Sequence, residues 1–541
     1  MGGTADAERG TPALKYSTRS HAREFDIPGT VDLNAREGEP TGYGQALYPV
    51  PSEDPNDPLQ WPNWKKNAIL IICALYSFLG NSALTGPSVY IAIYAEQFGV
   101  SEARASALIS YPNLAFGFGN FFLVPLYLKF GRRPVMLISM AFFLGGLIGA
   151  SQANSYNSLM VSRVMQGFGS GVCEALPVQL VNDIFFLHER GKRLGYYTIC
   201  LCLGAVAPLW AGYMLAGGYS WRLFFYVVIA VQGALFIAAF LFVEETSYKR
   251  ELPKVSPEGS TVGDNEKLQE PTHTETVTPI PERKTFLQTL SPLGKYDPEV
   301  SFFMTMIRSF TYFPIPAVFW VITTYGIYIG LGAFSFNYVF PLKIMEEPYN
   351  WSETNSGLIA VATLIAYALA LPFTTTSDRL AAYLTKRNNG IRESEMRLGV
   401  LLFPMLIAPA GLVVFGFTAE RNLHWIGYFA GVAMDQFASY WYFTFTLAYA
   451  VDSYYANTSE MLIAMNLGKQ AISFGMSLYL LDWVLEHGYA VVIAGIFGAV
   501  LLANNLAVII FMIWGKRIRR YTANSWLGKL HQRTATVGMT H

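Results

Sequence analysis

Long apolar runs alternate with short polar stretches along most of the chain. A helix that spans a membrane needs about 20 apolar residues, and twelve windows meet this length. Two sets of six windows flank a polar stretch from about 244 to 300, whose Glu, Thr, Pro and Ser content is typical of disorder. The pattern predicts an all-α membrane protein with twelve transmembrane helices in two pseudo-symmetric six-helix bundles. The windows are roughly 67–93, 104–128, 134–153, 157–184, 194–216, 222–243, 317–342, 355–376, 399–418, 425–451, 461–482 and 489–514.

The same pattern sets the expected domain boundaries. The first 60 residues are polar and lack the apolar core of a signal peptide, so we expect them to remain as a tail. The predicted parts are a mostly disordered tail (1–65), a first bundle (66–243), a largely disordered linker (244–312), a second bundle (313–515) and a second tail (516–541).

Composition agrees with a membrane protein and excludes several other classes. The chain is 52% hydrophobic and only 14% charged, whereas soluble proteins carry about 25% charged residues. The four cysteines lie in apolar windows and the seven histidines lie in loops or tails. We therefore expect no metal site, no cofactor, no nucleic-acid partner and no enzymatic activity, and a monomer in the lipid bilayer.

The short loops indicate the orientation. With the N-terminus inside, seventeen Lys and Arg residues fall in cytoplasmic short loops and the C-terminal tail, against four in outside loops. The positive-inside rule then puts both termini and the linker in the cytoplasm, and we expect the plasma membrane as the location. Asn350 begins a sequon outside and is a weak glycosylation candidate, whereas Asn457 should be unmodified.

A cationic turn, KFGRRP, separates the second and third windows. Gly131 permits a tight turn, and Arg132 and Arg133 can contact carboxylates or helix C-terminal carbonyls on the cytoplasmic face. Simple positive-inside anchoring is the alternative. Leu128, just before the turn, is apolar and cannot pair with these arginines.

The fourth window carries two charges inside the predicted membrane region, Arg163 and Glu174. Charged residues within a span usually face the bundle interior and have a function. Eleven helical steps put both on one face, about 16 Å apart, which suits a path for a proton or cation. Snorkelling remains open for Arg163, and a structural ion pair or a permanently protonated carboxyl remains open for Glu174.

The chain resembles the major facilitator superfamily over about residues 50 to 520. Gly131, Arg132 and Arg133 match its signature between helices 2 and 3, and the run LMVSRVMQGFG matches its helix 4 pattern. The resemblance is strongest to the fungal twelve-helix drug:proton antiporter branch. Within that branch, the chain is similar to yeast permeases for histidinol and polyamines. It implies a link between Arg163 and proton coupling, and a gating charge cluster at the turn, in which Leu128 stands where the family has an acidic residue.

Further charges at helix ends are candidate gating residues. Asp183, at the end of the fourth window, is expected to replace the missing acid by contacting Arg132 or Arg133; a solvated loop charge is the alternative. Arg190 belongs to a charge cluster that resembles one in fungal members of the family. Asp378 and Arg379 look like the second-half echo of the turn between helices 2 and 3.

Polar and aromatic residues of several windows are candidates for a central cavity. Asp435 is the one mid-span acid of the second half, so we expect it to bind substrate or a proton together with Arg163 and Glu174. Lys469 and Asp452 could form a gate pair or lie at the interface. Single aromatics could be simple packing. The expected cavity lining is Asn81, Thr85, Tyr325, Asn337, Tyr338, Gln436, Tyr440, Trp441 and Gln470.

These observations predict a proton-coupled secondary transporter for a small organic solute, cationic or amphipathic, that works by alternating access. We expect efflux of a drug or secondary metabolite, with proton-driven uptake of polyamine- or histidinol-like cations as the alternative. A non-transporting nutrient sensor is the rival from another class, although the short C-terminal tail argues against it. The proton gradient would supply the energy.

Overall fold

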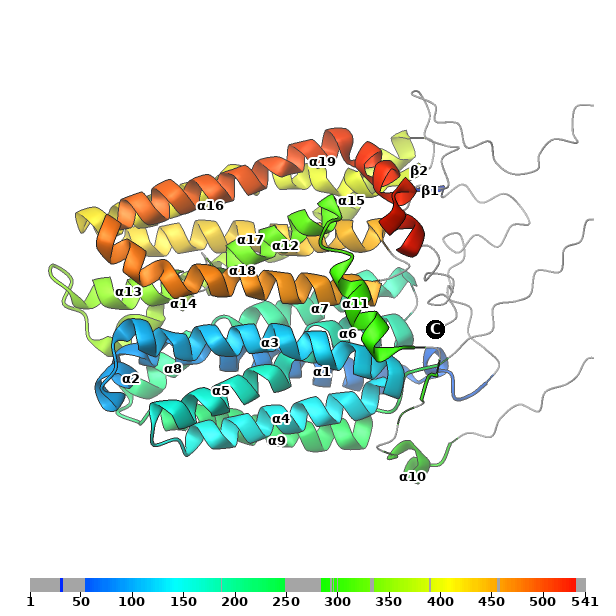
Figure 1. Ribbon diagram of the computed structural model, residues 1–541, viewed down its shortest axis with the longest axis horizontal. Helices are drawn as coiled ribbons and strands as arrows, with labels where there is room; N and C mark the ends of the chain where they lie inside the picture. The colour runs from blue at the N-terminus through cyan, green and yellow to red at the C-terminus, as the bar shows by residue number, and fades with distance from the viewer. Residues whose placement is uncertain are drawn as a thin grey trace, which may run out of the picture.

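The computed structural model describes residues 30–32, 54–185, 187–248, 284–291, 294, 296–298, 300–330, 335–388, 391–454 and 458–531. Two helical bundles lie side by side in Figure 1, with the first half of the chain below the second. Helix α3 of the first half packs along α18 of the second and forms the seam between them.

The first half contains helical elements at all six expected windows. Its elements are η1 (Pro58–Gln60), α1 (Asn63–Thr85), η2 (Gly86–Tyr90), α2 (Ile91–Phe98), α3 (Glu102–Phe130), α4 (Arg132–Ser151), α5 (Tyr156–Ser170), η3 (Gly171–Cys173), α6 (Ala175–Ile184), α7 (Leu187–Gly204), α8 (Ala207–Ala216) and α9 (Arg222–Phe242).

The second half also has helical elements at each of its six windows. Its elements are α12 (Pro316–Tyr328), α13 (Phe336–Met345), η5 (Glu353–Leu358), α14 (Ile359–Ala370), η6 (Leu371–Phe373), α15 (Thr376–Arg387), η7 (Ser394–Leu402), η8 (Pro404–Leu406), α16 (Ile407–Arg421), α17 (Ile426–Ser453), α18 (Thr458–His487), η10 (Ala490–Phe497) and α19 (Gly498–Asn524).

Seven spans in the described residues are long and apolar enough to cross a membrane, and the pair bent by 60° at Phe403 makes an eighth. The spans below this criterion are those of α5–α6, α12–α13, α17 and α18. These helices carry Arg163, Glu174, Asp435 and Lys469 or are broken into short pieces. Three of these four spans, those of α5–α6, α17 and α18, carry Arg163, Glu174, Asp435 and Lys469.

Breaks in the first and fourth spans position the site. Pro87 lies in η2, where the first span changes from α1 to α2. The fourth span is interrupted by η3, so Glu174 is the residue that begins α6. The expectation of one regular helix through Arg163 and Glu174 is therefore wrong, because η3 separates α5 from α6.

Several short elements gather at the end that carries the Arg132 turn, on the right in Figure 1. We call this end the inner end and the opposite one the outer end, following the predicted orientation. The sequence did not predict structure here in the first tail or the linker. The tail contributes β1 (Thr30–Asp32), which pairs antiparallel with β2 (Ile391–Glu393), and the linker contributes α10 (Phe286–Thr289) and α11 (Phe302–Phe310).

Candidate functional site

Glu174 and Lys469 form an ion pair that joins the two halves near the centre of the molecule. Glu174 begins α6 and Lys469 lies on α18, so each half supplies one charge. The side chains are largely buried, with exposed fractions of 18% for Glu174 and 5% for Lys469. Lys469 and Asp452, for which a gate pair was one of two alternatives, do not pair with each other: Lys469 contacts Glu174 and Asp452 contacts Arg397.

Aromatic and thiol groups surround this ion pair. The Lys469 ammonium lies 5.4 Å from the ring centroid of Tyr325, within range of a cation–π contact. The Tyr325 hydroxyl donates to the carbonyl of Phe443 at 2.5 Å, and the two rings stack with centroids 4.5 Å apart. Cys202 is close enough to interact electrostatically with Glu174 and Lys469. Tyr325 and Cys202, one from each half, therefore lie next to the pair.

Asp435 occupies a second buried position, within the second half. Its side chain is fully buried, and the amide nitrogen of Gln436 donates to Oδ2 at 3.3 Å. Tyr367 donates to the other end of the Gln436 amide at 2.9 Å. Oδ1 has no hydrogen-bond partner, and no Lys, Arg or His of the described residues lies within ion-pair distance. Asp435 therefore differs from Glu174, whose carboxylate contacts a lysine.

Arg163 is fully buried and holds three helices together, so snorkelling is excluded. Its guanidinium donates to the carbonyls of Leu108 in α3 at 3.1 Å, of Leu84 in α1 at 3.1 Å and of Ala83 in α1. In a regular helix the carbonyl of residue i accepts from the N–H of residue i+4.

Two of these carbonyls have lost their helical donor. Residue i+4 is Pro112 for Leu108 and Pro87 for Ala83, and proline has no N–H. Arg163 therefore supplies the hydrogen bonds that two prolines remove. No carboxylate lies within ion-pair distance of it among the described residues, and the structure does not bring it into contact with Glu174.

The predicted contact between the 2–3 turn and Asp183 is present. Arg132 Nε lies 3.2 Å from Asp183 Oδ2. Glu245, just after α9, accepts from the backbone N–H groups of Arg132 at 3.0 Å and of Arg133 at 3.2 Å. Asp183 and Glu245 thus supply the negative charge that Leu128 lacks, and Glu245 also caps the start of α4, where the helix dipole favours an anion.

Arg133 binds the linker rather than a carboxylate. Its guanidinium donates to the carbonyls of Thr289 and Leu290, the latter at 3.2 Å, and to that of Phe240 at 2.7 Å. Gly131 has φ +99°, and a Cβ there would lie 2.3 Å from Glu245 Oε2. This crowding explains a glycine at the turn.

The inner end of the second half has its own charge cluster. Arg397 Nη1 lies 2.6 Å from Asp378 Oδ1, and Arg397 Nε lies 2.5 Å from Asp452 Oδ2. Arg379, the predicted partner of this motif, is exposed, and no carboxylate of the described residues pairs with it. The side chain of Arg190 lies outside the described residues, so its predicted role stays a prediction.

The remaining predicted cavity residues lie in several different parts of the molecule. Asn81 and Thr85 hydrogen-bond the carbonyls of Leu201 and Gly204 and so join α1 to α7. Gln470 packs against Gly117 at the seam. Trp441 packs among phenylalanine rings of its own half, which fits the simple-packing alternative. The other predicted residues lie near Asp435 (Tyr440, beside Tyr367) or at the outer end (Asn337, Tyr338). Asn350, at the outer end, is exposed.

Sequence reasoning missed Glu245 and Arg397 and did not pair Lys469 with Glu174. The run EET after the sixth window was a signal for Glu245, because an acid near a cationic turn is a candidate partner. The sequence contains no signal that α6 and α18 are neighbours, since Glu174 and Lys469 are 295 positions apart.

Known proteins resemble this chain in both sequence and fold. The sequence profile of the Major Facilitator Superfamily matches residues 70–473. Protein HOL1 of Saccharomyces cerevisiae is 25% identical, covering 96% of this chain and 99% of HOL1. MFS-type transporter penM of Penicillium rubens is 25% identical, covering 94% and 97%.

Among solved structures, the proton:xylose symporter XylE superposes with a TM-score of 0.57 at 12% identity, covering 84% of this chain and 97% of XylE. This likeness confirms the predicted all-α membrane fold. With the profile match over most of its length, the chain is an integral membrane transporter that belongs to the major facilitator superfamily.

Proposed function

We propose that the protein is a proton-coupled secondary transporter of small organic cations, in which a substrate ammonium and Lys469 bind Glu174 in turn. The ion pair between Glu174 and Lys469 carries this proposal. Removing one partner of a buried pair leaves an uncompensated charge and costs about 3–5 kcal/mol. A substrate cation that replaces Lys469 keeps the Glu174 carboxylate paired, so the cost of an unpaired charge falls on Lys469 alone.

The location of the pair couples binding to conformational change. Glu174 belongs to the first half and Lys469 to the second, so the pair holds the halves together at the centre. A substrate that displaces Lys469 removes this contact and favours movement of one half against the other. A ligand shifts a conformational equilibrium only through such a difference in interaction between states.

Exchange at one carboxylate favours antiport. If Glu174 binds either a substrate cation or a proton, the two travel in opposite directions, and an inward proton gradient drives efflux. This supports the drug:proton antiporter type, exporting a drug or secondary metabolite across the plasma membrane, with both termini in the cytoplasm. Arg163 would act as a positioning residue, and the charge clusters of Asp183 and Asp378 as inner gates.

Asp435 favours a second candidate, proton symport. It is buried away from any cation of the described residues and can hold a proton while Glu174 holds a substrate. Two separate sites occupied together would carry substrate and proton in the same direction, as uptake of polyamine- or histidinol-like cations requires.

Transport by the purified protein in liposomes tests both candidates. Radiolabelled spermidine, histidinol and tetraphenylphosphonium are offered with pH gradients of either sign. We expect Glu174→Gln to abolish gradient-driven transport, while Glu96→Gln, an exposed acid of α2, leaves it intact. Undiminished transport by Glu174→Gln would refute the assignment. Substrate movement against the proton flux indicates antiport; movement with it, lost in Asp435→Asn, indicates symport.

A further inference from the structure

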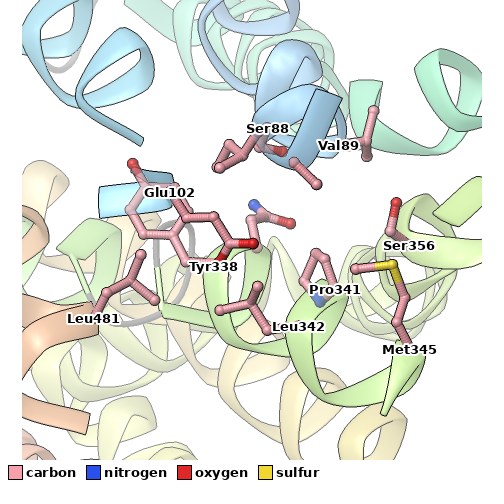
Figure 2. A pocket seen from close by; sticks show the side chains of 12 residues that line it. Ser88, Val89, Glu102, Tyr338, Pro341, Leu342, Met345, Ser356 and Leu481 are labelled. Carbon is pink, nitrogen blue, oxygen red and sulfur yellow. The ribbon is translucent and has the colours of Figure 1, made fainter. Parts of the chain in front are cut away.

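A small cavity lies between the halves at the outer end, lined by Ser88, Glu102 and Tyr338 among others (Figure 2). Its volume is about 20 Å³, which is room for about one water molecule, so it offers no site for an organic ligand. A surface of unusual chemistry lies instead at the inner end, on helix α11 (Phe302–Phe310) of the linker.

The polar and apolar faces of α11 are inverted relative to those of a helix in water. Thr305 and Ser309 are buried, whereas Phe303, Ile307 and Phe310 are exposed to 74%, 61% and 51%. The three exposed residues are spaced four and three positions apart, so they share one face of the helix. An amphipathic helix in water buries its apolar face. The exposed face of α11 therefore requires an apolar environment.

The opposite side of α11 rests on the seam between the halves. The helix packs on both α3 and α18 and lies across their inner ends (Figure 1). The ring of Phe310 meets that of Phe121 in α3 edge-on, with centroids 5.4 Å apart. Arg308 Nη1 lies 3.8 Å from Oε1 of Glu460, in the first turn of α18. Contacts with both halves thus hold α11 in place and direct its apolar face away from the protein.

This apolar face continues a surface that lies in the membrane. Phe118 and Phe122 of α3 are exposed, and they lie within a span long and apolar enough to cross a bilayer. The ring of Phe122 packs on Phe121 with centroids 5.2 Å apart, and Phe121 in turn contacts Phe310. A row of aromatic rings therefore leads from the membrane-exposed side of α3 to α11.

We propose that the exposed face of α11 is a lipid-binding surface, inserted among the acyl chains of the leaflet at the inner end. The nine residues of α11 extend about 14 Å, which is too short to cross a hydrocarbon core of about 30 Å. The helix would lie along the membrane surface, as interfacial amphipathic helices do. This inference rests on the membrane fold and not on the proposed substrate or on proton coupling.

Insertion of α11 has a consequence for the seam. Because α11 contacts α3 of the first half and α18 of the second, separation of their inner ends must break one of these two contacts. A helix held by lipid cannot follow both halves as they separate. Lipid binding by α11 would therefore favour the arrangement in which the inner end is closed.

Electron paramagnetic resonance of the full-length protein in liposomes of phosphatidylcholine and phosphatidylglycerol tests the lipid contact. A nitroxide on Phe303→Cys or Ile307→Cys should collide with oxygen, which dissolves among acyl chains, more often than with a water-soluble nickel chelate. Phe122→Cys provides the lipid reference. Arg387→Cys, at an exposed arginine that ends α15, provides the water reference. Labelled wild type gives the background from the four native cysteines.

The ratio of oxygen to nickel collisions separates the occupants of this face. At Phe303→Cys and Ile307→Cys the ratio should equal that at Phe122→Cys and exceed that at Arg387→Cys several-fold. A ratio like that at Arg387→Cys would show water and overturn the proposal. Few collisions with either reagent would show that protein covers the face, and would overturn it equally. Spin–spin broadening would then identify the covering protein as a second copy, and its absence would identify another segment of the chain.

Amide hydrogen exchange in lipid nanodiscs measures the anchoring independently. The double variant Phe303→Gln, Ile307→Gln should exchange several-fold faster than wild type at 302–310, while α3 and α18 keep their wild-type protection. Tyr383→Gln, which removes an exposed aromatic residue of α15 at the same end, is the matched control and should leave α11 unchanged. Equal exchange of α11 in wild type and the double variant would contradict anchoring by lipid. Loss or retention of transport in Glu174→Gln affects neither measurement, so this proposal and the proposed function fail separately.

Discussion

Single residues in this protein act through the partners that the fold brings to them. Arg163 resembles a proton-coupling residue in sequence, yet its guanidinium donates to three backbone carbonyls and to Oε1 of Gln166, and to no carboxylate of the described residues. The carbonyls of Ala83 and Leu108 have no helical N–H donor, because Pro87 and Pro112 occupy the donor positions. The residue therefore stabilises breaks in two helices, and any effect on transport passes through the geometry of those helices.

Replacing Arg163 by Met should lower the free energy of unfolding by about 2–4 kcal/mol, because charged hydrogen bonds to buried carbonyls are lost. Pro112→Ala restores an N–H for the Leu108 carbonyl, so it should recover about 1 kcal/mol in the Arg163→Met background. A double-mutant cycle of unfolding in detergent measures this coupling.

Pro125→Ala is the matched control, since Pro125 also lies inside α3 but away from the Arg163 contacts. It should show no coupling to Arg163→Met. Coupling of equal size for Pro112 and Pro125 would contradict the account of Arg163 as the replacement donor.

Whole elements at the inner end interact through the tails and linker. The C-terminal tail returns to the turn between α11 and α12 at His531, whose ring stacks on Tyr312 with centroids 4.1 Å apart and lies 2.6 Å from the Thr311 hydroxyl. Burial, with a smaller contribution from Arg308, lowers the pKa of His531 to about 4. The neutral ring therefore fits this contact and the charged ring does not.

Docking of this tail should weaken as the pH falls. The free tail binds more protons than the docked one between the ordinary histidine pKa of about 6.5 and about 4, so the docked state loses stability on acidification through this range. We expect amide hydrogen exchange at 525–531 to accelerate from pH 7.5 to 5, after correction for intrinsic rates.

His531→Phe keeps the stack on Tyr312 but cannot take up a proton. Its tail should exchange at the same corrected rate at both pH values. The same acceleration in His531→Phe as in wild type would show that another group titrates.

At the scale of the whole molecule, the two halves are in close contact across the outer end. Elements η2, α3 and α8 of the first half pack on α13, α18 and η5 of the second. The α8–η5 contact is tight, because a Cβ on Gly357 would lie 2.2 Å from the carbonyl oxygen of Pro208. A glycine is needed where one backbone approaches another this closely.

Gly357→Ala should therefore open the outer end by forcing α8 and η5 apart. Spin labels at the exposed Glu96 and Leu423 positions, on opposite halves, should show a larger population of long distances by pulsed electron resonance. Gly233→Ala, where a Cβ would meet nothing within 4 Å, is the control and should leave the distribution unchanged. If Gly357→Ala had the same distance distribution as wild type, the contact between α8 and η5 would not be what holds the outer end closed.

The sequence by itself determined the twelve helical windows, their division into two halves and the family, because apolar runs of membrane length and the turn signature are local features. It also identified Glu174 and Asp435 as buried acids and led to the contact of Arg132 with Asp183. Only the tertiary structure showed that Glu174 pairs with Lys469, and that Arg163 donates hydrogen bonds to carbonyls whose helical N–H donor is replaced by a proline. Those partners lie far apart in sequence, and residue spacing carries no information on which helices become neighbours across a bundle.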